Sequence, residues 1–167
     1  FSDSAFYNAL KNTFIFTLGT LVPTIVGGLA IAMVLKKNVK GSALYKAIIF
    51  SPWITPTVAI SIVWSWIFEP KYGFANYILQ VFNIPKSQWL QSSNTAMIGV
   101  IIVTVWKGFG WAMVFYLTAL EKVPKQLYEA AAIDGANMWN KFISITLPLI
   151  SPTTFFLSII TTINSLQ

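Results

Sequence analysis

Long apolar runs, each with at most one charge, alternate with short polar segments along this chain. Four runs stand out, at residues 13–35, 47–68, 96–120 and 149–167. As an α-helix, the first run is about 34 Å long, which is enough to cross a bilayer hydrocarbon core of about 30 Å. The pattern therefore predicts an all-α membrane protein, a polytopic transmembrane helix bundle that forms a single domain over residues 1–167.

Small side chains recur every fourth position in the first run. They are Thr20, Thr24, Gly28 and Ala32. Residues four apart lie on one face of a helix, and a face of small residues lets a neighbouring membrane helix approach closely. We expect this stripe to be a packing face.

The second run contains two prolines, Pro52 and Pro56. Each removes a backbone hydrogen-bond donor and favours a kink. Trp53 lies near one end of this run, and Trp64 and Trp66 lie near the other. Tryptophan is enriched at membrane interfaces, so these three side chains are expected to be interfacial anchors.

The segment 121–148 contains residues that are typical of the starts and ends of two short helices. Pro124 suits the first turn of a helix, and Gly135 suits the left-handed residue that ends it. Asn137 can cap a second short helix, and Pro148 suits the first turn of the last membrane helix. The sequence thus predicts a helix–glycine turn–helix between two spans.

Two interpretations of this segment remain open from its residues alone. Ala130, Ala131 and Ala132 give the first short helix a smooth surface that can enter a groove in a partner. Alternatively, the helix rests on the membrane surface. Glu129 either contacts a partner or braces the loop, and Asp134 either fixes the turn or contacts a partner.

Charge strengthens the membrane interpretation and suggests an orientation. The chain is 56% hydrophobic and 10% charged, and its net charge of +6 includes eleven lysines and no arginine. Residues 36–46 carry four lysines, whereas residues 69–95 carry two. Cytoplasmic loops are lysine-rich, so 36–46 and 121–148 are expected in the cytoplasm and 69–95 outside. This distribution does not favour nucleic-acid binding, which would cluster the charges on one face.

Several kinds of chemistry are excluded within these 167 residues. The chain has no Cys and no His, which removes disulfides, Cys- or His-based metal sites and His-dependent nucleophiles. It also lacks a G-x-x-x-x-G-K-[ST] phosphate loop. An intramembrane enzyme stays a weak alternative, because Asp3 and Asp134 are the only aspartates and no Ser shares the third run with Lys107. A structural helix bundle is the other rival class. We expect no catalytic residue and no metal site.

Lys107 is the single charge in the third run. A charge at mid-membrane costs at least about 2.5–3.5 kcal/mol, so Lys107 is expected to face either a pathway or a partner group. Trp106 and Trp111 flank it, and a donor beside aromatic rings suits a sugar. The fourth run is unusually polar, with Ser158, Thr161 and Asn164 among its residues. These side chains either line a cavity or bond across helices.

The spacing in the 121–148 segment resembles a known motif. Glu129-Ala130-Ala131 is followed after three residues by Gly135 and after nine more by Ile145-x-Leu147-Pro148. This matches the EAA loop of binding-protein-dependent ABC importer permeases. Asp134, Ala136 and Phe142 resemble the carbohydrate-uptake branch. A second pattern resembles the first permease subunit of maltose-type and glycerol-phosphate-type systems, in Pro56, Trp64, Phe68, Pro70, Gly73 and Asn76.

The resemblance implies a membrane-spanning permease of an ATP-driven sugar importer in a bacterial or archaeal plasma membrane. The loop 121–148 would then couple to a cytoplasmic ATPase through one set of residues: Glu129, Ala130, Ala131, Asp134, Gly135, Ile145, Leu147 and Pro148. The implied partners are a second permease subunit, two copies of an ATP-binding subunit, an extracytoplasmic solute-binding protein, the sugar and membrane lipid. ATP and Mg²⁺ would bind the partner ATPase, and no cofactor would bind this chain.

The resemblance leaves the solute and the extent of the chain open. Phosphate, polyamine and peptide importers are the alternatives within the same family. Family members usually have about six spans, so a first and a last helix are expected to be missing from this apparently truncated chain.

Overall fold

The computed structural model describes residues 4–36 and 41–166, and every regular element among them is helical. This confirms the expected all-α architecture. The elements are α1 (Ser4–Lys36), α2 (Ser42–Ile54), α3 (Thr57–Ile67), α4 (Phe74–Val81), η1 (Trp89–Gln91), α5 (Ser93–Glu121), α6 (Lys125–Ile133), α7 (Met138–Lys141), the π-helical turn η2 (Phe142–Thr146) and α8 (Leu147–Ser165).

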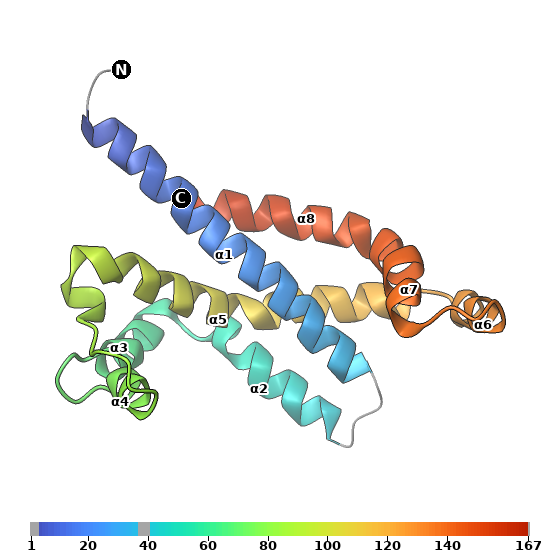
Figure 1. The fold of residues 1–167 in the computed structure, drawn as a ribbon, viewed down its shortest axis with the longest axis horizontal. Coiled ribbons are helices and arrows are strands. Elements are labelled where there is room, and N and C mark those ends of the chain that lie inside the picture. Colours follow the sequence, from blue (N-terminus) through green and yellow to red (C-terminus); the bar gives the residue numbers. More distant parts are fainter. Residues whose placement is uncertain (1–3, 37–40, 167) are drawn as a thin grey trace.

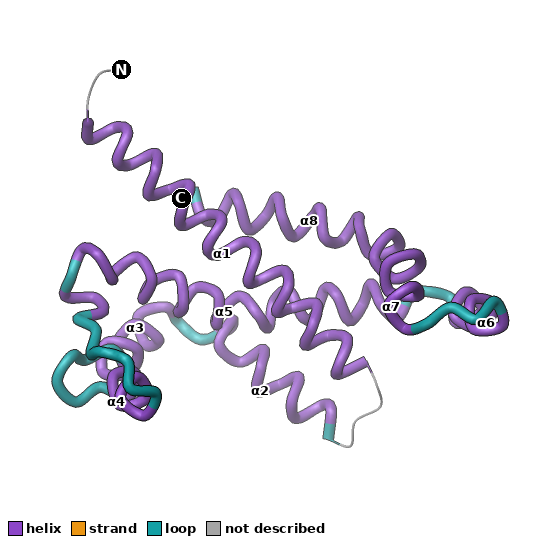
Figure 2. Tube along the Cα trace, in the orientation of Figure 1, coloured by secondary structure: helices purple, strands orange, loops and turns teal. Residues whose placement is uncertain are grey.

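Long helices form a bundle with a different cap at each end. α1 lies across α5 and α8, while α2 packs on another side of α5 (Figure 1, Figure 2). α3, α4 and η1 gather at one end of the bundle, and α6 and α7 lie at the opposite end (Figure 1). The end of α1, the start of α2 and the 121–148 segment therefore share one end, as the expected topology requires. Residues 37–40 of the 36–46 connection lie outside the described residues.

Three described helices are long and apolar enough to cross a membrane: Ala5–Lys36, Ser93–Glu121 and Met138–Ser165. Each is longer than the apolar run that predicts it. The last of them includes α7, η2 and α8 in one continuous helical path, so the second short helix does not end before the last span. Residue 167, where the fourth run ends, lies outside the described residues.

The second apolar run is bent. α2 and α3 meet at 100° across Thr55 and Pro56, and together they are apolar enough to count as one broken span. Thr55 has φ −76° and ψ 136°, an extended conformation. A proline disfavours helical backbone in the residue before it, so Pro56 accounts for the break. Pro52 stays inside α2 and is buried.

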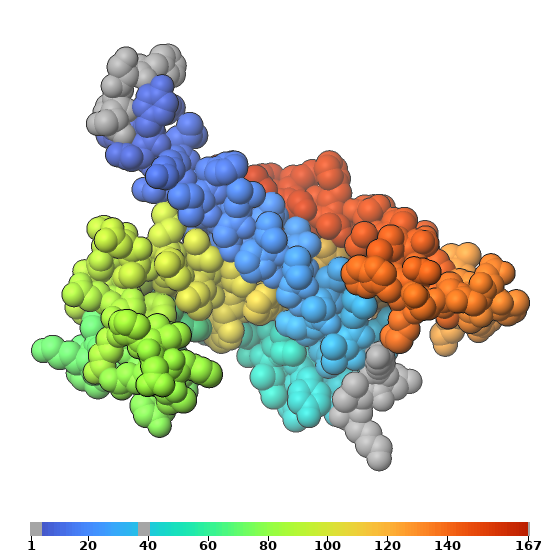
Figure 3. All heavy atoms as spheres, in the orientation of Figure 1, coloured from blue at the N-terminus to red at the C-terminus, as the bar shows by residue number. Residues whose placement is uncertain are grey.

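The small-residue stripe is the packing face of α1. Thr20, Thr24, Gly28 and Ala32 are all buried, and α1 lies over α5 in the space-filling view (Figure 3). A Cβ on Gly28 would lie 2.4 Å from the Cβ of Ala112 on α5. Since no pair of carbon atoms can pack at that distance, the two helices approach as closely as they do only because residue 28 is glycine.

The connection between α3 and α5 is ordered by one buried side chain. Asn76 on α4 donates to the carbonyls of Pro70 at 2.9 Å and Ser87 at 2.8 Å. Its Oδ1 accepts from the Ser87 backbone N–H at 3.0 Å and from Trp89 Nε1 at 2.8 Å. One amide thus satisfies groups from the whole connection, which makes this end of the bundle a folded cap.

Gly28→Ala tests the α1–α5 contact. Alanine is the better helix former by about 1 kcal/mol, yet the added methyl would overpack the interface and should destabilise the protein by about 1–3 kcal/mol. The measurement is the unfolding of the purified chain in detergent. Val26→Leu, on the exposed side of α1, is the control and should leave stability within about 0.5 kcal/mol of wild type. A Gly28→Ala protein at least as stable as wild type would contradict this packing.

Candidate functional site

The first arm of the α6–α7 hairpin ends in a complete helix-ending motif at Gly135. The backbone N–H of Gly135 donates to the Ala132 carbonyl at 3.1 Å, and that of Ala136 donates to the Ala131 carbonyl at 2.8 Å. Gly135 has φ +75°. This is the Schellman arrangement, in which a left-handed residue closes the helix. A Cβ at this position would meet no atom within 4 Å, so the need for glycine comes from the backbone angle alone.

The second arm of the hairpin is capped and then merges with α8. The Asn137 side chain accepts from the Asn140 backbone N–H at 2.8 Å, as the sequence predicts for a helix cap. Pro148 lies in the first turn of α8, as the sequence predicts, but α8 is not separated from α7, because the π turn η2 joins the two directly. A proline inside a helix removes one backbone hydrogen bond, and a π turn is one way in which a helix absorbs such an interruption.

The hairpin tip exposes apolar side chains. α6 has no buried residue. Ile133 is 87% exposed, Met138 is 78% exposed and Trp139 is 65% exposed. Soluble surfaces and loops rarely display large apolar side chains in such a group, and an exposed apolar group of this kind marks an interaction site.

The residues of the expected coupling motif divide between the tip and the base of the hairpin. Glu129, Ala130, Asp134 and Gly135 are exposed, and Ala131 is half-buried. At the base, Ile145 packs against the buried core, while Leu147 and Pro148 are exposed on the outside of α8.

Tyr128 fastens the hairpin to the bundle. Its hydroxyl lies 2.8 Å from the Thr146 hydroxyl, and its ring packs against the core cluster. The ammonium of Lys36, at the end of α1, lies 5.3 Å from the centre of the same ring, within cation–π range. Tyr128 is not among the site residues predicted from the sequence, because its role depends on a contact between helices and not on a local pattern.

A cavity of about 260 Å³ lies between α1, α2, α5 and α8. Its walls combine hydroxyl, amide and aromatic side chains: Phe16, Thr20, Thr24, Trp53, Thr104, Gly108, Trp111, Thr161, Asn164 and Ser165. Three of the side chains expected to face a pathway, Trp111, Thr161 and Asn164, are therefore brought together here.

Trp111 brings an unused donor to the cavity. Its ring stacks on Trp53 with centroids 5.0 Å apart, so Trp53 packs against α5. The Trp111 Nε1 atom is buried and has no hydrogen-bond partner. A buried indole N–H usually finds an acceptor, so this donor is available to a ligand or a water.

The other expected pathway residues lie outside the cavity walls. Lys107 donates from Nζ to the Thr57 hydroxyl at 2.7 Å, at the first residue of α3. Trp106 packs edge-on against Trp64. Ser158 donates to the Thr154 carbonyl of its own helix at 2.7 Å. The mid-membrane lysine therefore has a partner at the α2–α3 bend.

No group of three or more His, Cys, Asp or Glu residues that could hold a metal ion occurs within the described ranges 4–36 and 41–166. The features that these helices bring together are therefore a polar cavity inside the bundle and an exposed hairpin at one end.

Comparison with known proteins gives a family and several relatives. The family described as "Binding-protein-dependent transport system inner membrane component" matches residues 14–167. The trehalose/maltose transport system permease protein of Thermococcus litoralis is 36% identical over 140 residues, covering 84% of this chain and 48% of that protein. The arabinooligosaccharides transport system permease protein of Bacillus subtilis is 35% identical over 168 residues, covering 99% of this chain and 54% of that protein.

A solved structure has the same helix arrangement. A chain of the bacterial alginate ABC transporter, crystallised in complex with an alginate pentasaccharide-bound periplasmic protein, matches with a TM-score of 0.82 and 25% identity. The match covers 96% of this chain and 56% of that chain. The present chain spans about half the length of the curated relatives it matches.

A double-mutant cycle tests the Lys107–Thr57 hydrogen bond. Lys107→Met and Thr57→Val should each destabilise the purified chain, and the two losses should not add, with a coupling of about 1 kcal/mol after allowance for the partial exposure of this pair. Ser61→Ala is the control, because the Ser61 hydroxyl donates only to the Thr57 carbonyl of its own helix and should be additive with Lys107→Met. If the losses in unfolding free energy of Lys107→Met and Thr57→Val were fully additive, the contact between the two side chains would not hold the bend.

Proposed function

Because this chain belongs to the family of binding-protein-dependent transport system inner membrane components, we propose that it is a permease subunit of an ATP-driven sugar importer. It is a multi-pass membrane protein. The sugar assignment is supported by the names of its relatives, which are permeases for trehalose and maltose and for arabinooligosaccharides. The structural neighbour belongs to an alginate transporter.

The observation that carries the mechanism is the exposed apolar tip on a hairpin that is continuous with a membrane helix. Loop 121–148, with Glu129, Ala130, Ala131, Asp134 and Gly135 on its outer part, would insert into a groove of an ATP-binding subunit. Burial of the three large side chains at the tip would supply most of the contact energy, since each fully buried large apolar side chain is worth about 1.5–3 kcal/mol. Movement of the partner would then reach α8 directly, because helical structure continues from Met138 to Ser165.

The cavity would be the part of the translocation pathway that this subunit contributes. Sugars have apolar ring faces and many hydroxyls, and the walls offer a matching set of groups. The stacked Trp53 and Trp111 rings present an aromatic surface, Trp111 Nε1 is an unused donor, and Thr161 and Asn164 supply polar atoms. The cavity walls would be supported from outside by Trp106, Lys107 and Ser158. Of these, Lys107 would hold the α2–α3 bend beside the cavity.

The assembly would contain further subunits. We propose a second permease, two copies of the ATP-binding subunit and an extracytoplasmic solute-binding protein, with ATP and Mg²⁺ held by the ATP-binding subunits. The folded cap of α4 and η1 would then lie outside the cell, and the α6–α7 hairpin would lie in the cytoplasm. The lysine-rich end of the bundle supports this orientation.

Gly135→Val tests the coupling role of the hairpin. A β-branched residue in the left-handed conformation costs about 1–2 kcal/mol, so the angle between α6 and α7 should change and less ATP-binding subunit should copurify. Ala131→Trp should also reduce copurification, because the larger side chain would clash with the groove of the ATP-binding subunit. The measurements are subunit retention, ATPase activity and uptake in proteoliposomes.

The matched control for this experiment is Gly135→Asn, because asparagine tolerates positive φ and the site has room for a side chain. This variant should keep most of the subunit retention and the uptake. Unchanged retention and fully coupled uptake in both Gly135→Val and Ala131→Trp would exclude the hairpin as the coupling element.

Thr161→Phe tests the cavity as a pathway. The ring would fill much of the 260 Å³ space, and uptake should fall by about tenfold or more while the ATP-binding subunit still copurifies. Ile159→Phe on the exposed side of the same helix is the control and should transport normally. Equal uptake by the two variants would place the pathway elsewhere.

A further inference from the structure

A second pocket lies at the base of the hairpin, apart from the cavity described above. It has a volume of about 300 Å³. Its walls come from the ends of α1 and α5, from α6, and from the α7–η2 segment: Met33, Lys36, Leu120, Tyr128, Met138, Lys141, Phe142 and Thr146. The pocket thus joins the membrane bundle to the hairpin.

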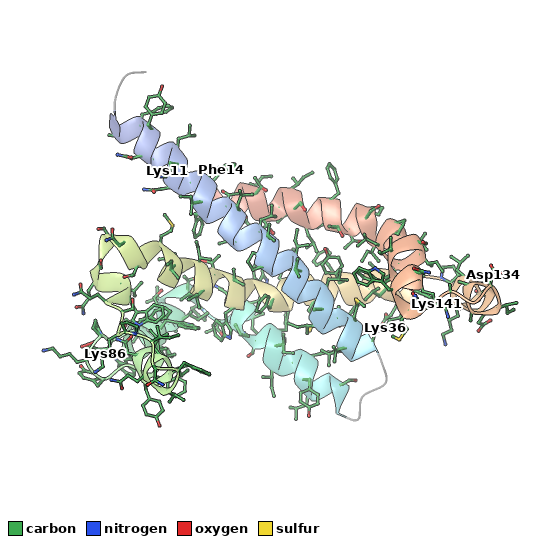
Figure 4. All side chains as sticks on the ribbon, viewed as in Figure 1. Lys11, Phe14, Lys36, Lys86, Asp134 and Lys141 are labelled. Atoms are coloured by element: carbon green, nitrogen blue, oxygen red, sulfur yellow. The ribbon has the colours of Figure 1, made fainter. Side chains whose placement is uncertain are left out.

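Two cationic side chains border this pocket. Lys36 comes from the last residue of α1, and Lys141 comes from the last residue of α7. The two lie at the same end of the molecule, which is also the end where Asp134 lies (Figure 4). Among the residues that the structure describes, neither lysine forms an ion pair. The Lys36 ammonium instead lies over the Tyr128 ring.

The remainder of the pocket is mostly apolar. Met33, Leu120 and Phe142 supply hydrocarbon and aromatic surface, and the hydroxyls of Tyr128 and Thr146 lie 2.8 Å from one another. One of these two hydroxyls donates to the other, so a phosphate between the lysines could accept at most one further hydrogen bond from the pair. A ligand that fits all of these groups is an anion attached to a hydrocarbon chain.

We propose that this pocket binds the head group of an anionic phospholipid. The phosphate would lie between Lys36 and Lys141, and an acyl chain would cover the apolar wall. The position is suitable, because the pocket is at the end of α1, where a membrane-spanning helix reaches the lipid head groups. Basic pockets between membrane helices on the cytoplasmic side bind anionic head groups, and each lysine near the surface contributes about fivefold in affinity.

Charge complementarity favours this occupant over the alternatives. A zwitterionic lipid carries its own cation, which the two lysines would repel. Free inorganic phosphate would leave the apolar wall in contact with water. A partner protein that binds the hairpin tip would contact Ile133 and Trp139, which do not line this pocket, and would share only Met138 with it. A bound lipid would stabilise the hairpin by connecting α7 to α1, and this inference does not depend on the identity of the transported solute.

Native mass spectrometry tests the proposal on the full chain, purified from its membrane with the subunits that copurify. The protein is titrated with phosphatidylglycerol, with phosphatidylcholine and with inorganic phosphate. Wild type should bind phosphatidylglycerol tightly at one site, phosphatidylcholine more weakly and inorganic phosphate least. The double variant Lys36→Gln/Lys141→Gln should bind phosphatidylglycerol about 30-fold more weakly at that site.

Two control variants separate this site from general charge effects. Lys71→Gln/Lys86→Gln removes the same charge at the opposite end, where Lys86 lies (Figure 4), and should bind as wild type does. Lys36→Arg/Lys141→Arg keeps the charge and should retain lipid binding at the site. This variant shows whether changing the two side chains disrupts the fold irrespective of their charge.

Three lipid-binding results would overturn the proposal, and one result on subunit composition would do so too. The first three are equal affinity of wild type and the Lys36→Gln/Lys141→Gln variant, equal affinity of wild type for phosphatidylcholine and phosphatidylglycerol, and binding of inorganic phosphate as tight as that of the lipid. Loss of a copurifying protein subunit with lipid binding unchanged would also overturn it, because the pocket would then be a protein contact.

Discussion

The contact between Gly28 on α1 and Ala112 on α5 sets the distance between the two helices around which the bundle is built. A Cβ at residue 28 would lie 2.4 Å from the Ala112 Cβ, so at this point the two helix backbones are separated by no side chain larger than the Ala112 methyl group. One turn earlier on α1, Thr24 faces Gly108, whose own Cβ would lie 3.0 Å from the Thr24 Cγ2. Thr24 and Gly108 both line the cavity. The close approach thus fixes one wall of the cavity and brings the end of α1 beside the hairpin.

A continuous helical connection from the hairpin to the cavity follows from the path of the last helix. α7, η2 and α8 form one helical segment, with Asn137 at its start and Thr161 and Asn164 on the cavity wall near its end. Tyr128 ties the other arm of the hairpin to this segment through Thr146. We infer that a force on the hairpin would tilt α8, since the helical path continues through η2 without a break, and would change the cavity that α8 lines.

The sequence predicts the elements well where the determinants are local. Apolar runs locate the long helices, and the spacing of Thr20, Thr24, Gly28 and Ala32 locates the α1 packing face, because helical periodicity is visible in the sequence. Gly135 and Asn137 predict the turn and the cap of the hairpin, since both act on their own backbone. Pro56 predicts the bend, though the two prolines alone do not reveal that the break falls at Thr55.

The sequence does not predict contacts that depend on how the helices come together. Pro148 correctly predicts the start of α8, but not the π turn η2 that joins α8 to α7 in one continuous helical path. Lys107 requires a partner, yet Thr57 lies fifty residues away and its position depends on the bend. Trp53 has the position of an interfacial anchor, and only the packing of α2 on α5 places it against Trp111.

Site-specific cross-linking to a copurified ATP-binding subunit is the most direct test of the account. The 167 residues contain no Cys, so single substitutions report single positions. Ile133→Cys lies at the hairpin tip, where residue 133 is 87% exposed, and Tyr72→Cys lies at the opposite end, where residue 72 is 81% exposed. The account predicts that only the Ile133→Cys protein cross-links to the ATP-binding subunit. A cross-link from Tyr72→Cys and none from Ile133→Cys would contradict it.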